Sequence, residues 1–259
     1  MYYLVILYHN YHKNARLKLK SQRTPRVSPV FFVGGIMKYI IHACSKRLWY
    51  VEGYLIPSMK EQGISDIKIA LDDRLEGCLF AIMRNFAECG QKKGGAWHLQ
   101  DDVVISRDFR EKTEEYDNGV VCGFWHRYRS DQVFREGKIE VSEMNYSFPC
   151  IRIPNEIAGE FAEWFYQDAG QREKYKKWVE AKKYVDSFFM EFMRERYGDG
   201  YVYNLKPSIV EHVDWLIGGS TVNKWREEDC RAECFDDPGA IEKLREWIKK
   251  AGLKVCFFI

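Results

Sequence analysis

The sequence has no Cys-x-x-Cys pair, no apolar run as long as a membrane span, and almost no net charge. Its eight cysteines are scattered along 259 residues, which favours buried thiols in a reducing, cytoplasmic compartment over a disulfide framework or a zinc site. No stretch approaches the ~20 consecutive apolar residues of a transmembrane helix, so we expect no membrane span. The formal net charge is +2, and this gives no reason to expect a nucleic-acid partner.

Acidic residues are missing altogether from residues 1–36, which carry six basic residues, and subtracting six from +2 leaves −4 for residues 37–259. A basic arm for phosphate-rich partners, a targeting peptide and an extension outside the functional fold are all open. The third is favoured because "YYLVIL" is too short for a signal peptide and has no basic residue before it,. "GGIM" at 34–37 is also what a ribosome-binding sequence and an initiator codon look like when translated in frame. We therefore expect Met37 to be the natural start and residues 1–36 to be a disordered or non-native extension.

The remaining chain alternates between apolar runs and segments with helical spacing. Hydrophobic residues make up 46% of the sequence, enough for a substantial core. Runs at 38–44, 67–73 and 96–99 are typical of buried strands, and the segments between them have the apolar period of helices,. This order predicts an α/β fold with a parallel sheet covered on both faces. Further expected elements are strands at 119–125 and 148–154 and helices at 153–165, 172–197 and 240–252.

Polar residues follow each of the first three predicted strands. Ser45 and Arg47 follow the first, Asp72 the second, and Asp101 with Asp102 the third. Ligands of such sheets bind at the carboxyl ends of the strands. Adjacent carboxylates repel each other unless a cation is close, and Mg²⁺ and Mn²⁺ are held by carboxylates together with substrate phosphates. Two interpretations are open: the acidic pair holds a metal diphosphate, or Asp102 caps a following helix.

Three segments, in order, resemble motifs of nucleotide-sugar glycosyltransferases of the GT-A type, bacterial or phage-like. They are "LDDRLEGC" (71–78), "LQDDV" (99–103) and "LKPSIVEHV" (205–213). The similarity covers about residues 37–222, with residues 223–259 expected as a helix and tail packed on that domain. It implies a GT-A-like, Rossmann-type mixed sheet with helices on both faces in a single domain. It also implies transfer of a sugar from a nucleotide-diphosphate sugar to an acceptor hydroxyl, with Mn²⁺ or Mg²⁺ as cofactor.

The resemblance assigns roles to individual residues of these motifs. Asp102 is implied to be the direct metal ligand, His212 a further metal or diphosphate ligand, and Asp101 a ribose or metal contact. Asp72 corresponds to the aspartate that reads the nucleotide base and ribose. Gln100 departs from the pattern, because an amide in place of a carboxylate adds no charge and weakens or alters metal binding. A histidine such as His212 is also common as a packed or capping residue.

An inverting transferase needs a base to take the proton of the acceptor hydroxyl. Asp186 is the candidate, since it lies beside an apolar helical stripe in "KYVDSFFMEF" and resembles the acidic helix start at which inverting members place their base. Glu211 and Asp214 are rivals, Asp186 is otherwise a solvated helix residue, and a retaining enzyme needs no base. Ser45, Arg47 and Lys224 are candidate contacts of the nucleotide or its phosphates.

Two other functions remain open at this point. A nucleotidyltransferase also binds a metal nucleotide on a similar sheet, but usually has a glycine-rich loop after the first strand, where "HACSKRLWY" has no glycine. A non-catalytic protein that binds a nucleotide sugar is the other alternative. The acceptor is equally open: a surface glycan, a protein, or phage DNA with a hydroxymethylated base.

Overall fold

A computed structural model describes most of the chain beyond residue 37. The described residues are 38–72, 78–116, 118–125, 136–143, 148–168, 172–180, 185–218, 232 and 234–253. The predicted N-terminal extension and Met37 lie outside them, as does most of the apolar C-terminal tail. The chain divides into two units, residues 1–35 and 36–259, and the fold below is that of the second.

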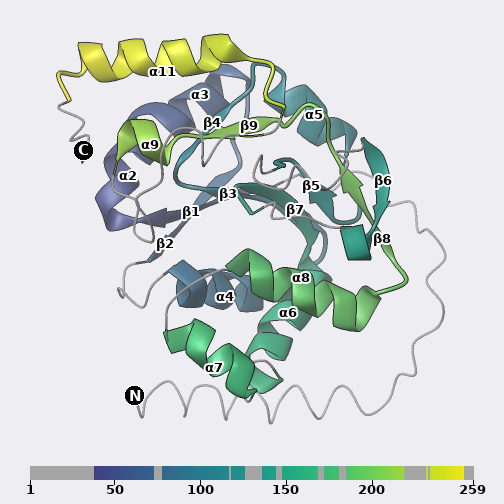
Figure 1. The fold of residues 1–259 in the computed structure, drawn as a ribbon. Coiled ribbons are helices and arrows are strands. Elements are labelled where there is room, and N and C mark those ends of the chain that lie inside the picture. The colour runs from purple at the N-terminus through teal and green to yellow at the C-terminus, as the bar shows by residue number, and fades with distance from the viewer. Residues whose placement is uncertain are drawn as a thin grey trace. The chain divides into compact units, whose positions relative to one another are not determined.

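A seven-stranded mixed sheet forms the centre of this unit, in the order β2-β1-β3-β7-β5-β8-β6 (Figure 1). The strands are β1 (Lys38–Cys44), β2 (Ile67–Asp72), β3 (Gly95–Gln100), β5 (Val121–Cys122), β6 (Gly137–Glu140), β7 (Cys150–Pro154) and β8 (Tyr201–Asn204). β1 pairs in parallel with both β2 and β3, whereas β7 is antiparallel to β3. The carboxyl ends of the three parallel strands therefore meet at one edge of the sheet.

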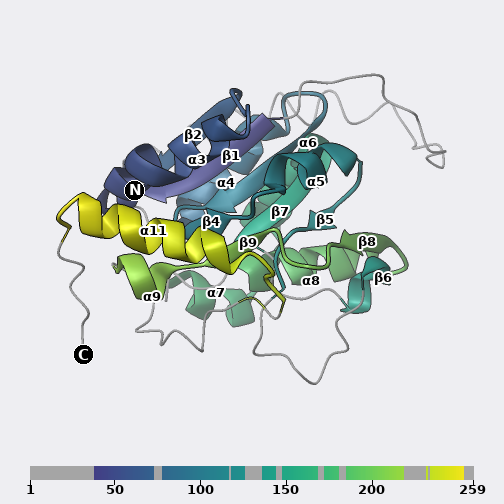
Figure 2. The same cartoon turned by 90° about the horizontal axis from the view of Figure 1, so that it is seen from above.

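Helices cover both faces of the sheet (Figures 1 and 2). One face carries α4 (Cys78–Cys89), α6 (Asn155–Gln167), α7 (Glu173–Glu180) and α8 (Val185–Tyr197); the other carries the continuous run η1 (Ser45–Arg47), α2 (Leu48–Tyr50), η2 (Val51–Leu55) and α3 (Ile56–Glu61), then α5 (Phe109–Glu115), α9 (Asp214–Ile217) and α11 (Pro238–Lys250). Side chains of a strand alternate between faces, so Ile40 lies in one core and Ile41 in the other. The α/β class with two covered faces, as predicted, is confirmed.

A second, two-stranded sheet lies on the α11 side of the main one. It consists of β4 (Val103–Ile105), directly after the acidic pair, and β9 (Val210–His212). The two strands are antiparallel, and Val103 is paired with His212. Both strands are almost entirely buried in the same core. This pairing fixes the "LKPSIVEHV" segment against the end of β3.

The predicted order of the first strands is confirmed, but one predicted helix is wrong. The segment 172–197 contains two helices, α7 and α8, with residues 181–184 outside the described part. The rings of Tyr175 in α7 and Phe188 in α8 are 5.3 Å apart, whereas a straight helix would separate positions thirteen residues apart by about 20 Å. Both rings belong to the same core cluster as the buried residues of α6, so α7 and α8 are not parts of one straight helix. No helix of the described residues is long and apolar enough to cross a membrane.

Candidate functional site

The candidate site lies where the parallel strands end. Asp101 and Asp102 form the turn between β3 and β4, and Arg47 ends the short turn η1 that follows β1. Because β1 and β3 are parallel neighbours, with His42 opposite Gln100, the two segments leave the sheet side by side. All three charged side chains are buried, with 5 to 6% of each residue exposed.

Arg47 provides the cation that two adjacent carboxylates require. Its Nη1 donates to Oδ1 of Asp101 at 2.7 Å and also to Oδ2 of Asp102. The second oxygen of Asp101 accepts the backbone N–H of Cys44 at 2.7 Å. Burial lowers the pKa of Arg47, but the charges of Asp102 and Asp101 outweigh it, so the guanidinium stays protonated. Asp101 is thus held by two donors from the β1 side of the edge.

The free side of Asp102 faces His212. Oδ1 of Asp102 is buried without a well-formed hydrogen bond and lies 3.2 Å from Nε2 of His212. The other ring nitrogen, Nδ1, is 3.6 Å from Oδ1 of Asp214, the first residue of α9. Burial disfavours the charged imidazole, but Asp102 and then Asp214 outweigh it and raise the pKa of His212 to about 9. Charges therefore alternate from Asp101 through Arg47, Asp102 and His212 to Asp214.

These charges also determine the protonation of the acidic pair. Burial raises the pKa of Asp102, but Arg47 and His212 together outweigh it and hold the pKa below its ordinary value. For Asp101, burial raises the pKa, Arg47 opposes it, and the neighbouring Asp102 adds to the rise. Asp102 is accordingly the more firmly ionised member of the pair. An ionised carboxylate beside an imidazole nitrogen is a donor set for a divalent metal.

The residues present fit such an ion. Ligand atoms of Asp102, His212 and Asp214 all lie within 4.8 Å of one another. Two neighbouring ligands each about 2.1 Å from an octahedral ion are themselves about 3 Å apart, close to the 3.2 Å between Asp102 Oδ1 and His212 Nε2. Asp214 faces the opposite ring nitrogen, so it suits the position of a carboxylate that orients a ligating histidine through Nδ1–H.

The structure brings together five of the residues singled out from the sequence: Arg47, Asp101, Asp102, His212 and Asp214, the last of which was a rival base. The alternative that Asp102 caps a helix is wrong, since the next element is the strand β4 and the following helix, α5, begins only at Phe109. Contact of Arg47 with a nucleotide stays a prediction, and its guanidinium is engaged with the two carboxylates. No sequence pattern indicated that engagement, or that Asp214 lies on the Nδ1 side of the imidazole.

The other predicted residues lie around this cluster or outside the described part. Ser45 is exposed in η1, and Asp72 is buried at the end of β2, opposite Cys44. Asp186 is half-buried in the first turn of α8, a helix of the core on the face opposite β9. Lys224 lies outside the described residues. The roles predicted for all four remain predictions.

One rival base has a structural task. Glu211 is 1% exposed, and its Oε1 accepts the backbone N–H groups of Ala232 at 2.6 Å and of His212 at 3.1 Å. Removing this carboxylate would take away the acceptor of both N–H groups, and leaving a buried donor unpaired is costly. Glu211 therefore fixes the backbone around β9.

No protein-family model and no curated protein sequence matches this chain. Solved structures resemble it at low identity. A protein assigned as a glucose-1-phosphate thymidylyltransferase from Bacillus anthracis, solved with sucrose, has 11% identity and a TM-score of 0.38 over 68% of this chain and 89% of its own. The glycosyltransferase GlyE of Streptococcus pneumoniae TIGR4 has 12% identity and a TM-score of 0.44 over 84% of this chain and 64% of its own. A glycosyltransferase involved in glycosylation of the major capsid of PBCV-1 has 9% identity and a TM-score of 0.39 over 82% of this chain and 98% of its own.

Proposed function

We propose that this protein is a metal-dependent glycosyltransferase that moves a sugar from a nucleotide-diphosphate sugar to an acceptor hydroxyl. One observation carries the proposal. Asp102 and His212 belong to two separate motifs that resemble those of GT-A glycosyltransferases, and their ligand atoms lie 3.2 Å apart at the carboxyl edge of the sheet. This is the edge at which sheets of this kind bind nucleotides.

Asp102 and His212 are the proposed ligands of a divalent ion, Mn²⁺ or Mg²⁺; the experiments use Mn²⁺. The bound ion would supply positive charge for the departing diphosphate. Asp214 orients His212 from the far side of the ring, and Arg47 keeps Asp102 ionised and in place. Both oxygens of Asp101 accept hydrogen bonds, from Arg47 and from Cys44. We therefore assign Asp101 to holding this edge together, in place of the predicted ribose or metal contact.

Proton removal from the acceptor is the remaining task of an inverting reaction. We assign it to Asp186, which starts α8 and is half-buried. Ser45, exposed directly after β1, and Asp72, at the end of β2, are proposed contacts of the nucleotide. Lys224 keeps its proposed role as a phosphate contact.

A nucleotidyltransferase fits this edge less well. That chemistry uses a glycine-rich basic loop after the first strand, whereas β1 runs directly into the turn Ser45–Arg47. That turn has two basic residues. Lys46 is exposed, whereas Arg47 is buried and pairs with two carboxylates, so its charge is already used inside the protein. A non-catalytic binding protein would have the metal site but would not catalyse the reaction. The experiment below distinguishes such a protein from a glycosyltransferase.

The test is a panel of nucleotide sugars offered with Mn²⁺, followed for slow hydrolysis of the donor and for thermal stabilisation. The proposal expects at least one donor to raise the melting temperature with Mn²⁺ and to be hydrolysed. Stabilisation without hydrolysis would identify a binding protein. If no nucleotide sugar or nucleoside diphosphate shifts the melting temperature with Mn²⁺, the proposed function is wrong. Asp168→Asn is the matched control, because this carboxylate forms an exposed ion pair with Arg196.

A further inference from the structure

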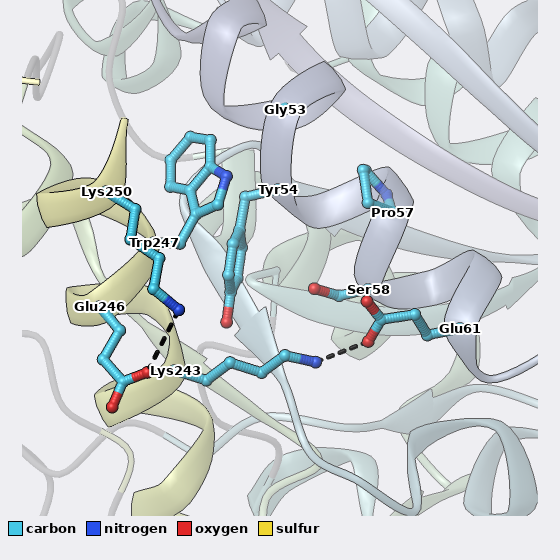
Figure 3. Close-up of a pocket in the computed structure, with 9 residues that line it drawn as sticks. All are labelled: Gly53, Tyr54, Pro57, Ser58, Glu61, Lys243, Glu246, Trp247 and Lys250. Atoms are coloured by element: carbon cyan, nitrogen blue, oxygen red, sulfur yellow. Dashed lines mark hydrogen bonds and ion pairs between the residues drawn. The ribbon is translucent and has the colours of Figure 1, made fainter. Parts of the chain in front are cut away.

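A groove separate from the acidic cluster runs between α11 and the helical run that follows β1. One hollow, of about 310 Å³, lies between η2, α3 and α11 (Figure 3). A second, of about 200 Å³, shares Tyr54, Ser58 and Lys243 with the first. The larger one is at the lower end of the ~300–1,000 Å³ typical of small-molecule sites. Two adjoining hollows of this size suit an elongated ligand built from small units.

Aromatic rings form one wall of the groove. Figure 3 shows the indole of Trp247 beside the phenol ring of Tyr54, with ring centroids 5.3 Å apart. Trp49 stacks on Trp247 at 5.9 Å with its ring within 4° of parallel, and Tyr50 stacks on Tyr54 at 5.6 Å. Tyr50 is fully buried, so the stack is anchored in the core. The faces of such rings carry partial negative charge, which attracts polarised C–H groups.

The opposite helix is shaped to admit the Trp247 ring. Residues Val51–Leu55 form a π-helical turn, and Gly53 lies in its middle. A Cβ atom at position 53 would lie 2.9 Å from Cζ2 of Trp247, too close for any other residue without a shift. Glycine inside a helix costs about 1 kcal/mol relative to alanine, and π turns are rare and frequent at functional sites. The glycine and the π turn therefore reduce the stability of this helix locally, and they allow the Trp247 ring to pack against it.

The rim of the groove is polar but carries no net charge. Nζ of Lys243 lies 2.5 Å from Glu61, and Nζ of Lys250 lies 3.9 Å from Glu246. The second hollow adds Arg107 and Asp237. Three basic side chains and three carboxylates then cancel, so the groove has no excess charge to attract a phosphate. An apolar peptide would leave these charged groups without water, which is costly. Paired charges and the Ser58 hydroxyl suit a neutral ligand with many hydroxyl groups.

We propose that this groove binds a neutral oligosaccharide, with the C–H face of one sugar ring against the partly exposed Trp247, which the buried Tyr54 supports, and with its hydroxyls on the charged rim. Binding itself does not depend on the transferase reaction. We also assign this saccharide as the acceptor of the sugar, and that assignment rests on the proposed function. Among the acceptors left open by the sequence, it favours a glycan over a protein or DNA.

The test uses the full chain in EDTA, without nucleotide, and a panel of neutral disaccharides and tetrasaccharides measured by saturation-transfer-difference NMR and calorimetry. At least one saccharide should bind, and the tetrasaccharide should bind more tightly than the disaccharide. Trp247→Ala should weaken binding at least tenfold, while Tyr201→Ala, which removes an aromatic side chain of a residue 54% exposed on β8, should leave it unchanged. No binding by the wild type, or equal binding by Trp247→Ala, would overturn the proposal.

A second variant covers the case in which Trp247→Ala does not fold. The double change Glu61→Gln with Lys243→Gln alters only exposed side chains and should weaken binding severalfold; unchanged binding would overturn the role of the rim. Competition by inorganic phosphate would overturn the choice of a neutral ligand. Nucleoside diphosphate with Mn²⁺ should stabilise Trp247→Ala as it does the wild type. If the saccharide binds and the nucleotide does not, saccharide binding in the groove is supported and the proposed function is wrong.

Discussion

Oδ1 of Asp102, the residue before β4, lies 3.2 Å from Nε2 of His212, the last residue of β9. Without a metal, a proton on His212 holds the two together, since the pKa of the imidazole is raised to about 9. A metal ion on Nε2 would replace that proton, so metal binding and protonation compete at the same atom. The same contact therefore governs both the stability of the metal-free protein and its affinity for Mn²⁺.

The metal-free protein should lose stability as the pH rises through the range in which His212 loses its proton. The folded pKa, about 9, lies above the ordinary 6.5, so the contribution is fully present below pH 6.5 and is lost between pH 6.5 and 9. A shift of this size corresponds to about 3 kcal/mol. Urea unfolding in EDTA at pH 6, 7.5 and 9 measures it. His212→Gln should flatten the profile, and equal pH profiles in the two proteins would contradict the assignment.

Removing the guanidinium of Arg47 should make the stability of the protein depend on metal. Breaking a buried ion pair by removing one partner costs about 3–5 kcal/mol, because Asp101 and Asp102 lose their shared cation. In Arg47→Met, Mn²⁺ should restore part of that loss by supplying positive charge beside Asp102. Chemical unfolding with Mn²⁺ or EDTA gives the difference.

Arg152→Met is the matched control for this change. Arg152 is as buried as Arg47, at 7% exposed, but its Nη1 donates to the carbonyl oxygen of Gly119, which is not a metal-binding carboxylate. Its loss should destabilise the fold in a way that Mn²⁺ does not repair. Equal recovery of both variants in Mn²⁺ would mean that the ion acts elsewhere.

Asp214→Asn should weaken Mn²⁺ binding without abolishing it. The carboxylate lies on the Nδ1 side of His212, 3.6 Å away, so it would orient the histidine without itself binding an ion held by Nε2. Loss of such an orienting group typically costs 10- to 100-fold in metal affinity. Calorimetric titration of Mn²⁺ measures this, with the surface change Asp168→Asn as the reference. A complete loss, as severe as that of His212→Gln, would make Asp214 a direct ligand.

Asp186→Asn should separate binding from chemistry. If Asp186 is the base, donor hydrolysis should fall about 10²-fold or more, while the thermal shift caused by Mn²⁺ and the donor stays the same. Glu191→Gln, on the same helix α8 and also half-buried, serves as the control. Full activity in Asp186→Asn would point to a retaining reaction or to another base.

The order of the motifs and the hydrophobic period predict which segments form the site, but not the contacts between its side chains. Alternating strands and helices predict that β1, β2 and β3 end at one edge, and the two motifs predict that Asp102 and His212 meet. No sequence pattern shows that Arg47 turns inward onto the carboxylates, because this depends on the parallel register of β1 and β3 and on the turn η1. The position of Asp214 likewise follows from the pairing of β4 with β9, a contact between distant segments.

The central claim is that Asp102 and His212 hold a metal nucleotide, and the thermal shift of wild type and Asp102→Asn tests it most directly. With Mn²⁺ and a nucleoside diphosphate at about 100 times Kd, binding stabilises by about 2.7 kcal/mol, or several degrees in Tm for a chain of this size. We expect this shift in the wild type and its metal-dependent part to vanish in Asp102→Asn. An equal metal-dependent shift in both proteins, or none in the wild type, would contradict the account.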